Sequence, residues 1–183
     1  NKIGVIFGVG IGGLHTFEEE VLNYAQTKDT IGPRFSPFFI PKMIADIASG
    51  HISMIYGFHG PNFTTTSACA SSSNAIGEAF NLIRLGKANM IVAGGAEATI
   101  YPAGVGGFNS MNALSTRNDD PTHASRPFSA SRDGFIMGEG AGCLILEELE
   151  HAKARGAKIY AELAGTGASA DAYHIPAPHP EGL

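Results

Sequence analysis

Short apolar runs alternate with helix-forming segments along this chain, and this alternation limits the folds that are open to it. Residues 2–7, 88–93 and 142–147 are apolar runs of strand length. Residues 17–24, 68–85 and 148–155 have the spacing of helices, and Gly86 and Gly156 stand just past two of them. Such an order predicts an α/β fold with a largely buried mixed or parallel sheet.

Local signals suggest further boundaries. Residues 63–67 and 158–165 are predicted as two more strands, and the 88–93 strand is predicted to end at Gly94 and Gly95. Thr16 is expected to cap the 17–24 helix, with three glutamates in its first turn. Residues 28–41 are predicted as a loop because four glycines and prolines interrupt them. Residues 43–48 are predicted as a short helix that ends at Gly50, and residues 52–56 are ambiguous.

Composition excludes several classes of protein. Twelve Lys and Arg against 17 Asp and Glu give a net charge of −5 over 183 residues, which argues against a nucleic-acid binder. Apolar residues make up 44% and charged residues 16%, so disorder is not expected. No apolar run reaches the roughly 18–20 residues that span a bilayer. Two cysteines are too few for a disulfide scaffold and favour a reducing, cytoplasmic setting.

Both ends of the sequence lie close to segments that are expected in the interior of a domain. The chain opens at Asn1 directly before an apparent core strand, and it closes at Leu183 after a proline-rich stretch at 176–180. We therefore expect a segment of a longer protein.

Cys69 is the strongest candidate for chemistry. Residues 66–72 read Thr-Ser-Ala-Cys-Ala-Ser-Ser, where a predicted strand runs into a predicted helix. Free N–H groups and the helix dipole favour a thiolate at such a junction, and small neighbours would let a substrate reach the sulfur. The alternative is that Cys69 is an ordinary small core residue. Cys143 lies in the middle of an apolar run and is predicted to be buried and structural.

A glycine pattern offers a competing signal. Residues 8–13 read Gly-Val-Gly-Ile-Gly-Gly after a strand and before a helix, which fits the G-x-G-x-x-G pattern of dinucleotide binding. The acidic residue expected about 20 positions later at the end of a second strand is missing, since residues 28–33 read as a loop. A tight turn packed against neighbouring backbone is therefore the favoured interpretation.

Other polar residues favour structural roles. Arg126 and Arg132 stand beside polar turns, where they could hold an anionic group but more simply pin a loop through internal ion pairs. Glu139, among small residues, is expected to be a buried, hydrogen-bonded carboxylate that braces the site. The seven histidines have no metal-ligand spacing and are expected to be satisfied or solvated; they are His15, His51, His59, His123, His151, His174 and His179.

The ordered motifs of the whole chain resemble the β-ketoacyl-[acyl-carrier-protein] synthase family, and most closely its type II elongating enzymes. The motifs are Gly-Pro-Asn at 60–62, Thr-Ser-Ala-Cys-Ala-Ser-Ser at 66–72, Val-Ala-Gly-Gly-Ala-Glu at 92–97, Gly-Val-Gly-Gly-Phe at 104–108, Ala-Leu-Ser-Thr-Arg-Asn at 113–118, Ser-Arg-Pro-Phe at 125–128, Arg-Asp-Gly-Phe at 132–135, Gly-Glu-Gly-Ala-Gly at 138–142 and Asp-Ala-Tyr-His at 171–174.

The resemblance implies a partial thiolase-like fold. Residues 1–183 would form part of a ketosynthase domain, comprising most of its first α/β half and the crossing into the second. The terminal parts of the family domain would be missing, and with them two catalytic histidines and a lysine of the downstream half. A homodimer is implied as well, with an interface that uses the strand before Cys69 and the loop at residues 36–39.

The resemblance also implies the chemistry and its residues. Cys69 would take an acyl chain from acyl carrier protein, and decarboxylation of malonyl carrier protein would then drive a condensation that lengthens the chain by two carbons. Ile11 and Phe108 match residues that line the acyl pocket, although ordinary core packing would also explain them. No cofactor or metal is expected, and neither nucleic acid nor a membrane is expected as a partner.

Three alternatives remain open at this point. The chain could belong to the ketosynthase module of a polyketide synthase, or it could be a catalytically inert fragment that binds acyl chains. A non-catalytic partner subunit that shapes the chain-length cavity is the third, and Cys69 argues against it because such subunits usually lack the cysteine.

Overall fold

A four-stranded mixed sheet forms the centre of the computed structural model, which describes residues 2–32 and 34–182. Asn1, Pro33 and Leu183 lie outside the described residues, so the predicted 28–41 loop is described only in part. The strand order is β2-β1-β3-β4, with bounds β1 Ile3–Gly8, β2 Asn62–Thr65, β3 Met90–Glu97 and β4 Gly140–Glu147. β1 pairs in parallel with β2 and β3, and β4 runs antiparallel to β3. The predicted mixed α/β sheet is confirmed.

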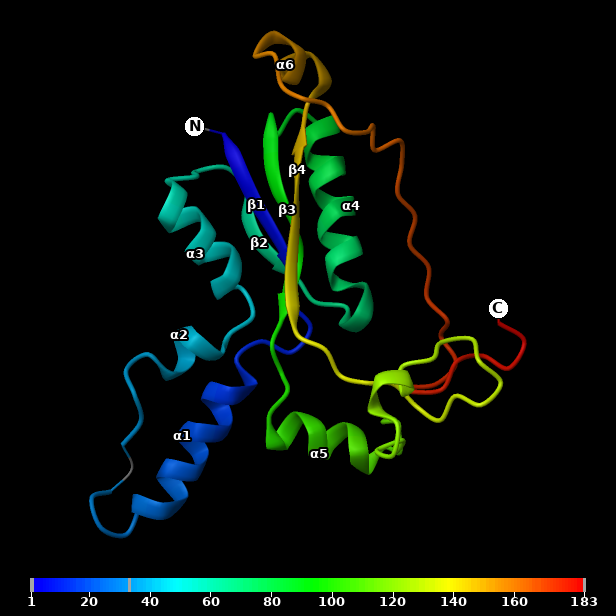
Figure 1. Cartoon of the computed structure of the whole chain (residues 1–183). Coiled ribbons are helices and arrows are strands. Elements are labelled where there is room, and N and C mark those ends of the chain that lie inside the picture. Colours follow the sequence, from blue (N-terminus) through cyan, green and yellow to red (C-terminus); the bar gives the residue numbers. More distant parts are fainter. Residues whose placement is uncertain (1, 33, 183) are drawn as a thin grey trace.

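Two helices cover opposite faces of this sheet (Figure 1). α4 (Ser71–Arg84) packs over β1 and β3 through a cluster that includes Ile6, Ala79 and Ile91. α3 (Ile47–Tyr56) packs on the other face, where Ala48 and Ile52 meet Val5, Phe7 and Val92. Successive residues of a strand point to opposite faces, so the continuous apolar run of β1 serves both helices.

The remaining helices lie beyond the two ends of the sheet (Figure 1). α1 (Leu14–Thr27), α2 (Phe39–Met43) and α5 (Pro102–Ser110) lie beyond the end at which β1 and β3 finish. α6 (Leu149–Ala154) follows β4 at the opposite end. Two short 3₁₀ helices, η1 (Ala68–Ala70) and η2 (Pro121–His123), complete the elements of the described chain.

Several predicted helix boundaries are wrong. α1 begins at Leu14, with Gly13 as its N-cap, so Thr16 lies inside the helix and the glutamates lie beyond its first turn. The predicted 43–48 helix is replaced by the end of α2 and the start of α3, and residues 52–56 are helical. Gly50 does not end a helix, because its N–H donates to Asp46 O at 3.1 Å and continues the ladder of α3. Gly57, with φ 64°, provides the left-handed end instead.

The strand predictions are confirmed except at two places. β3 continues through Gly94 and Gly95 to Glu97, because β4 pairs with it along that whole length. Residues 158–165 are exposed and form no strand, since no neighbouring strand in the described chain accepts their backbone hydrogen bonds. Cys143 is exposed rather than buried, because β4 is an edge strand and its outward face is uncovered.

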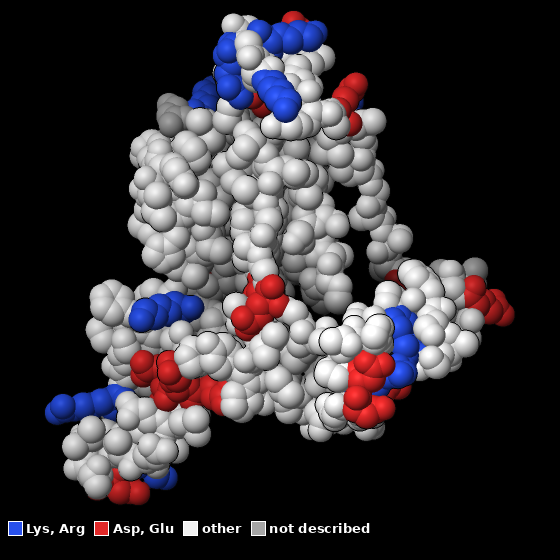
Figure 2. All heavy atoms as spheres, in the orientation of Figure 1, with Lys and Arg blue, Asp and Glu red and all other residues white. Residues whose placement is uncertain are grey.

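Uncharged surface extends over the middle of the face that Figure 2 shows. Figure 2 shows few charged side chains over the sheet region and a gathering of basic ones at the α6 end. Exposed apolar side chains in this middle region include Leu144 and Ile145 on β4 and Met54 and Ile55 on α3. Among the described residues, no helix is both long and apolar enough to cross a membrane.

Candidate active site

The carboxyl ends of three parallel strands bring the candidate residues together. β1, β2 and β3 run in the same direction, so the segments that follow them meet at one edge of the sheet. These segments are residues 9–13 (here the glycine loop) and residues 66–70 (here the Cys69 turn), with Glu97 at the end of β3. Clefts at this edge of an open α/β sheet are the usual place for ligands.

Cys69 lies in the single 3₁₀ turn between β2 and α4, and it is exposed. The preceding Ala68 has φ 49°, in the left-handed region that costs a residue with a Cβ energy. α4 then runs for 14 residues from Ser71, and its N-cap Ala70 makes no capping hydrogen bond through its side chain. The predicted strand–cysteine–helix junction is confirmed, with a tight turn in place of the first helical residues.

Hydroxyl groups hold the strained Cys69 turn in place. The buried Ser71 Oγ accepts from Ser67 N at 2.9 Å and donates to Ala68 O at 2.7 Å. Thr65 Oγ1 donates to Ser71 O at 2.8 Å, and Asn74 Nδ2 donates to Ser67 Oγ at 2.6 Å. The run of small polar residues around Cys69 therefore fixes the backbone from both sides.

Two glycines allow α4 to begin this close to the sheet. A Cβ on Gly8 would lie 2.3 Å from Ser71 C and 2.4 Å from Ser72 N. A Cβ on Gly95 would lie 2.0 Å from Ser72 Oγ and 2.6 Å from Gly8 O. A Cβ on Gly8 would require the start of α4 to move, whereas a Cβ on Gly95 would require the Ser72 side chain and the Gly8 carbonyl to shift. Close packing on the backbone of β1 therefore helps to set the position of the Cys69 turn.

The glycine loop wraps around the carboxylate of Glu97. Glu97 Oε2 accepts from Gly10 N at 2.9 Å and from Ile11 N at 2.8 Å, and Oε1 accepts from Gly12 N at 3.2 Å. These N–H groups are the ones that a bound phosphate would need in a dinucleotide site. An internal carboxylate occupies them, so the interpretation as a tight turn packed on neighbouring atoms is supported over the dinucleotide one.

The two predicted pocket residues lie in different surroundings. Ile11 is in the glycine loop, and that loop contacts the Cys69 turn because Thr66 Oγ1 donates to Val9 O at 3.0 Å. The Ile11 side chain is 46% exposed. Phe108, on α5, is half-buried and meets Phe135 edge-to-face, with ring centroids 5.2 Å apart. The described contacts therefore join the glycine loop that carries Ile11 to the Cys69 turn, and they place Phe108 against Phe135 of a later loop.

Glu97 is a residue of this edge to which sequence reasoning gave no role. The available signal was an acidic residue at the end of an apolar strand, directly after Gly-Gly-Ala. A carboxylate at the end of a buried strand requires hydrogen-bond donors. In the structure, the N–H groups of the glycine loop provide them.

A model of the family described as "Beta-ketoacyl synthase, N-terminal domain" matches residues 1–152. This chain belongs to the β-ketoacyl synthase family. It is 55% identical over 183 residues to 3-oxoacyl-[acyl-carrier-protein] synthase 2 of Synechocystis sp., covering 100% of this chain and 43% of that protein. It is 51% identical over 182 residues to the Staphylococcus aureus protein of the same name, covering 100% of this chain and 44% of that protein.

Solved structures confirm the fold of this β-ketoacyl synthase chain. A ketosynthase solved in complex with a type II polyketide synthase acyl carrier protein and bound to a hexaketide matches with a TM-score of 0.82 at 34% identity. The match covers 90% of this chain and 41% of that one. The chain therefore has a partial thiolase-like fold, and it spans less than half the length of the relatives it matches.

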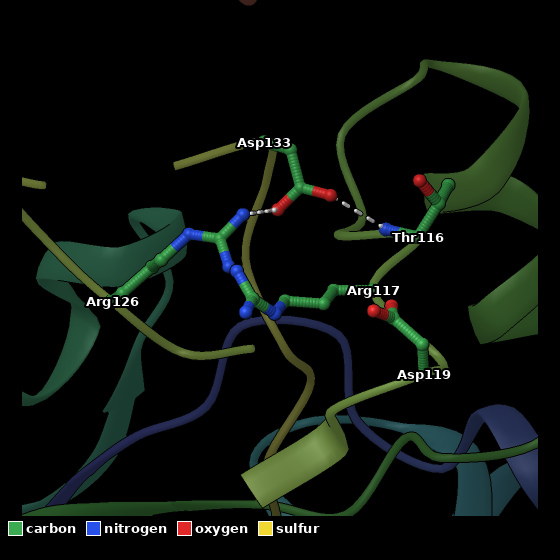
Figure 3. A pocket seen from close by; sticks show the side chains of 5 residues that line it. All are labelled: Thr116, Arg117, Asp119, Arg126 and Asp133. Carbon is green, nitrogen blue, oxygen red and sulfur yellow. Dashed lines mark hydrogen bonds and ion pairs between the residues drawn. The ribbon is translucent and has the colours of Figure 1, made fainter. Parts of the chain in front are cut away.

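Paired arginines fix the loop between α5 and β4 of this β-ketoacyl synthase chain (Figure 3). Arg126 Nη2 donates to Asp133 Oδ1 at 3.1 Å, and Arg126 Nε donates to Ser131 O at 2.8 Å. Arg117 Nη2 donates to Asp120 Oδ2 at 3.2 Å. The two guanidinium groups face one another in Figure 3. Together with Thr116, Asp119 and Asp133, the two arginines line a polar hollow of about 350 Å³. Arg132 Nη1 donates to Ser129 O at 2.9 Å. These contacts support the interpretation that Arg126 and Arg132 pin the loop through internal bonds.

The carboxylate of Asp133 makes the stability of this loop depend on pH. Ser115 Oγ donates to Asp133 Oδ1 at 2.7 Å and Thr116 N donates to Oδ2 at 3.1 Å; with Arg126, they hold the pKa of Asp133 below its ordinary value. A carboxylate with a depressed pKa stabilises the folded loop above the ordinary carboxyl pKa of about 3.9, and the effect is lost as pH falls through the lower, folded pKa.

We expect Ser115→Ala to raise the pKa of Asp133 toward its ordinary value, because the substitution removes the largest of these contributions. A carboxyl-detected NMR titration measures the shift. Ser110→Ala is the matched control, since Ser110 Oγ donates to Gly106 O within α5 and touches no carboxylate. An unchanged titration of Asp133 in Ser115→Ala would contradict the assignment.

The other singled-out polar residues have partners of their own. Glu139 is hydrogen-bonded as predicted, since its Oε1 accepts from Ile100 N at 2.8 Å, but it is exposed rather than buried. It lies at the surface because it immediately precedes the uncovered edge strand β4. His15 stacks on Tyr101 with ring centroids 3.8 Å apart. Within residues 2–32 and 34–182, no three His, Cys, Asp or Glu side chains form a group that could hold a metal ion.

Proposed function

We propose that this chain is an N-terminal-to-middle segment of a 3-oxoacyl-[acyl-carrier-protein] synthase of fatty-acid elongation, with Cys69 as its nucleophile. The observation that carries the proposal is the exposed cysteine in a strained turn, at the carboxyl ends of parallel strands and directly before α4. Such turns present a nucleophile to substrate while helix-start N–H groups lie nearby. The two relatives at 51–55% identity match this chain over its whole length, and both are named 3-oxoacyl-[acyl-carrier-protein] synthase 2.

The reaction has two balanced steps. Cys69 Sγ attacks the thioester carbonyl of an acyl carrier protein, a new carbon–sulfur bond forms, and the carrier's thiol leaves with the proton. Malonyl carrier protein then loses CO₂, and the resulting carbanion attacks the acyl-cysteine carbonyl. The carbon–sulfur bond to Cys69 breaks, the thiolate is regenerated, and a 3-oxoacyl product leaves on the carrier. The Cys69 N–H supplies part of the oxyanion hole.

Ile11 and Phe108 line the acyl pocket in this proposal. Both are apolar and incompletely buried, so each has surface that an acyl chain could cover. Covering such surface stabilises a bound chain by about 0.8 kcal/mol per buried methylene group. The proposal includes no metal or organic cofactor, because a thioester and a decarboxylating malonyl group supply the chemistry.

The partners are acyl carrier protein, loaded with an acyl or malonyl group on its phosphopantetheine, and a second copy of the chain. A related ketosynthase has been solved with its carrier protein, which supports the first. The homodimer would use β2, which is an edge strand with Phe63 37% exposed, and the loop at residues 36–39. We place the enzyme in the cytoplasm; both cysteines are free thiols, in keeping with a reducing setting.

Trapping the acyl-enzyme tests the proposal. The full-length protein is incubated with acyl carrier protein in the absence of malonyl groups, digested, and mapped by mass spectrometry. We expect one acyl group on the Cys69 peptide and none on the Cys143 peptide. Both thiols are exposed in the described chain, and iodoacetamide labelling of the full-length protein measures whether both are accessible there as well. Acylation of Cys143, or of neither residue, would refute the assignment.

The polyketide ketosynthase alternative is less well supported. The reported polyketide ketosynthase structure is 34% identical to this chain, whereas the elongation enzymes reach 55%. Product analysis distinguishes the two, since a fatty-acid enzyme accepts fully reduced acyl chains. An inert acyl-binding fragment would bind acyl chains without forming the Cys69 thioester.

A further inference from the structure

We propose that Glu97 is a positioning residue that fixes the glycine loop beside Cys69 and thereby sets which acyl-chain lengths the enzyme accepts. The inference rests on the proposed function, because it takes Ile11 as a wall of the acyl pocket. It adds a residue that acts through the loop backbone.

The contacts of Glu97 are concentrated on one short segment. Its two carboxylate oxygens accept from Gly10 N, Ile11 N and Gly12 N at 2.9, 2.8 and 3.2 Å. Hydrogen bonds to an ionised acceptor are roughly twice as strong as neutral ones. No ion pair of Glu97 with a basic side chain occurs in the described part of the chain. The described hydrogen bonds to the Glu97 carboxylate therefore come from backbone N–H groups of the glycine loop.

The loop is shaped to receive a carboxylate. Gly12 has φ 88°, a left-handed conformation that turns successive N–H groups toward one point. A Cβ on Gly10 would lie 2.7 Å from Glu97 Oε2, so the carboxylate sits directly against the loop. Close contact with the Glu97 carboxylate therefore explains the glycines of this loop, and nucleotide binding is not required to explain them.

Ile11 depends on this backbone for its position. Ile11 is 46% exposed in the described chain, so packing within this chain holds only part of its side chain. The loop is tied at its start by Thr66 Oγ1, which donates to Val9 O at 3.0 Å, and at its end by Gly13 N, which donates to Met43 O at 2.9 Å. Glu97 holds the three residues between those ties. Loss of its carboxylate would free the segment that carries Ile11 while both ends stay attached.

A role in proton transfer fits less well than positioning. The carboxylate oxygens of Glu97 already accept three hydrogen bonds from backbone groups. These donors cannot be exchanged for a substrate without opening the loop. Glu97 also ends β3, a central strand paired on both sides, which gives a rigid support for the loop.

The test uses Glu97→Gln in the full-length enzyme. Glutamine keeps the size of the side chain but presents an NH₂ group where one carboxylate oxygen accepted a bond. We expect the ratio of kcat/KM between preferred and disfavoured acyl-chain lengths to move about tenfold toward one, because a freed loop discriminates less. A merely structural role would lower activity on all chain lengths alike and leave that ratio unchanged.

A double-mutant cycle shows whether Glu97 acts through Ile11. Ile11→Ala removes the pocket wall, so adding Glu97→Gln to it should leave the chain-length ratio where Ile11→Ala put it. Independent, multiplying effects of the two substitutions on that ratio would overturn the inference. Glu150→Gln is the matched control, since Glu150 is an exposed side chain of α6 paired with Lys153 at 2.8 Å.

The outcomes separate this inference from the proposed function. If the wild type forms no acyl-Cys69 and condenses no substrate, the proposed function fails and the inference falls with it. If the wild type condenses and Glu97→Gln keeps the wild-type ratio, only the inference is overturned. Should Glu97→Gln fail to fold, Glu97→Asp decides in its place, because a carboxylate one methylene shorter loses reach to the loop and should shift the same ratio.

Discussion

Replacing Cys69 by Ala should lower condensation by at least about four orders of magnitude, because removing a covalent nucleophile eliminates the acyl-enzyme on which the second step depends. The measurement is formation of 3-oxoacyl carrier protein by the full-length enzyme from acyl and malonyl carrier proteins. The substitution removes one sulfur atom from an exposed turn whose backbone is held by Ser71 and Thr65, so the fold should persist.

Cys143→Ala provides the matched control for this experiment. Cys143 is also an exposed free thiol, but it lies within the edge strand β4 and not in the turn that leads into α4. We expect it to keep wild-type condensation. We also expect Cys69→Ala to retain decarboxylation of malonyl carrier protein, since the resemblance assigns that step to histidines of the downstream half. Condensation that survives in Cys69→Ala would exclude Cys69 as the nucleophile.

Gly8→Ala should destabilise the protein by about 3 kcal/mol, the upper part of the range for added atoms in a tightly packed interior. The new Cβ would lie 2.3 Å from Ser71 C and 2.4 Å from Ser71 O and Ser72 N, all of them backbone atoms. Relief of this overlap requires the start of α4 to move away from β1. Acylation of Cys69 should therefore fall together with the stability, because the Cys69 turn leads directly into α4.

Gly50→Ala is the control, and it should change the free energy of unfolding in the opposite direction. Gly50 lies within α3, and a Cβ there would meet no atom within 4 Å apart from its chain neighbours and the backbone of the helix itself. Alanine in a helix interior is about 0.5–1 kcal/mol more favourable than glycine, so this variant should be slightly more stable. Urea unfolding of both variants measures the difference. If Gly8→Ala unfolds at the same urea concentration as the wild type, close packing of α4 against β1 is not what positions the turn.

Local patterns were enough to predict most of the secondary structure around the site. β1, β3 and β4 are apolar runs, and α4 has helical spacing that stops before Gly86; these features depend on neighbours in sequence. The cysteine at the strand–helix junction was recognisable for the same reason. Cap and end assignments failed where tertiary contacts decided them: α1 begins at Leu14 beside the Gly13–Met43 hydrogen bond, and Gly50 continues α3.

The sequence by itself determined the α/β order, the family and the candidate nucleophile, because periodicity and contiguous motifs are carried by adjacent residues. Only the tertiary structure decided what Glu97 does, since its partners at Gly10, Ile11 and Gly12 are more than 80 positions away along the chain. It also decided that Cys143 is exposed, because strand order placed β4 at an edge. Hydrogen bonds and close contacts between distant segments depend on how the strands assemble, and no local pattern records that assembly.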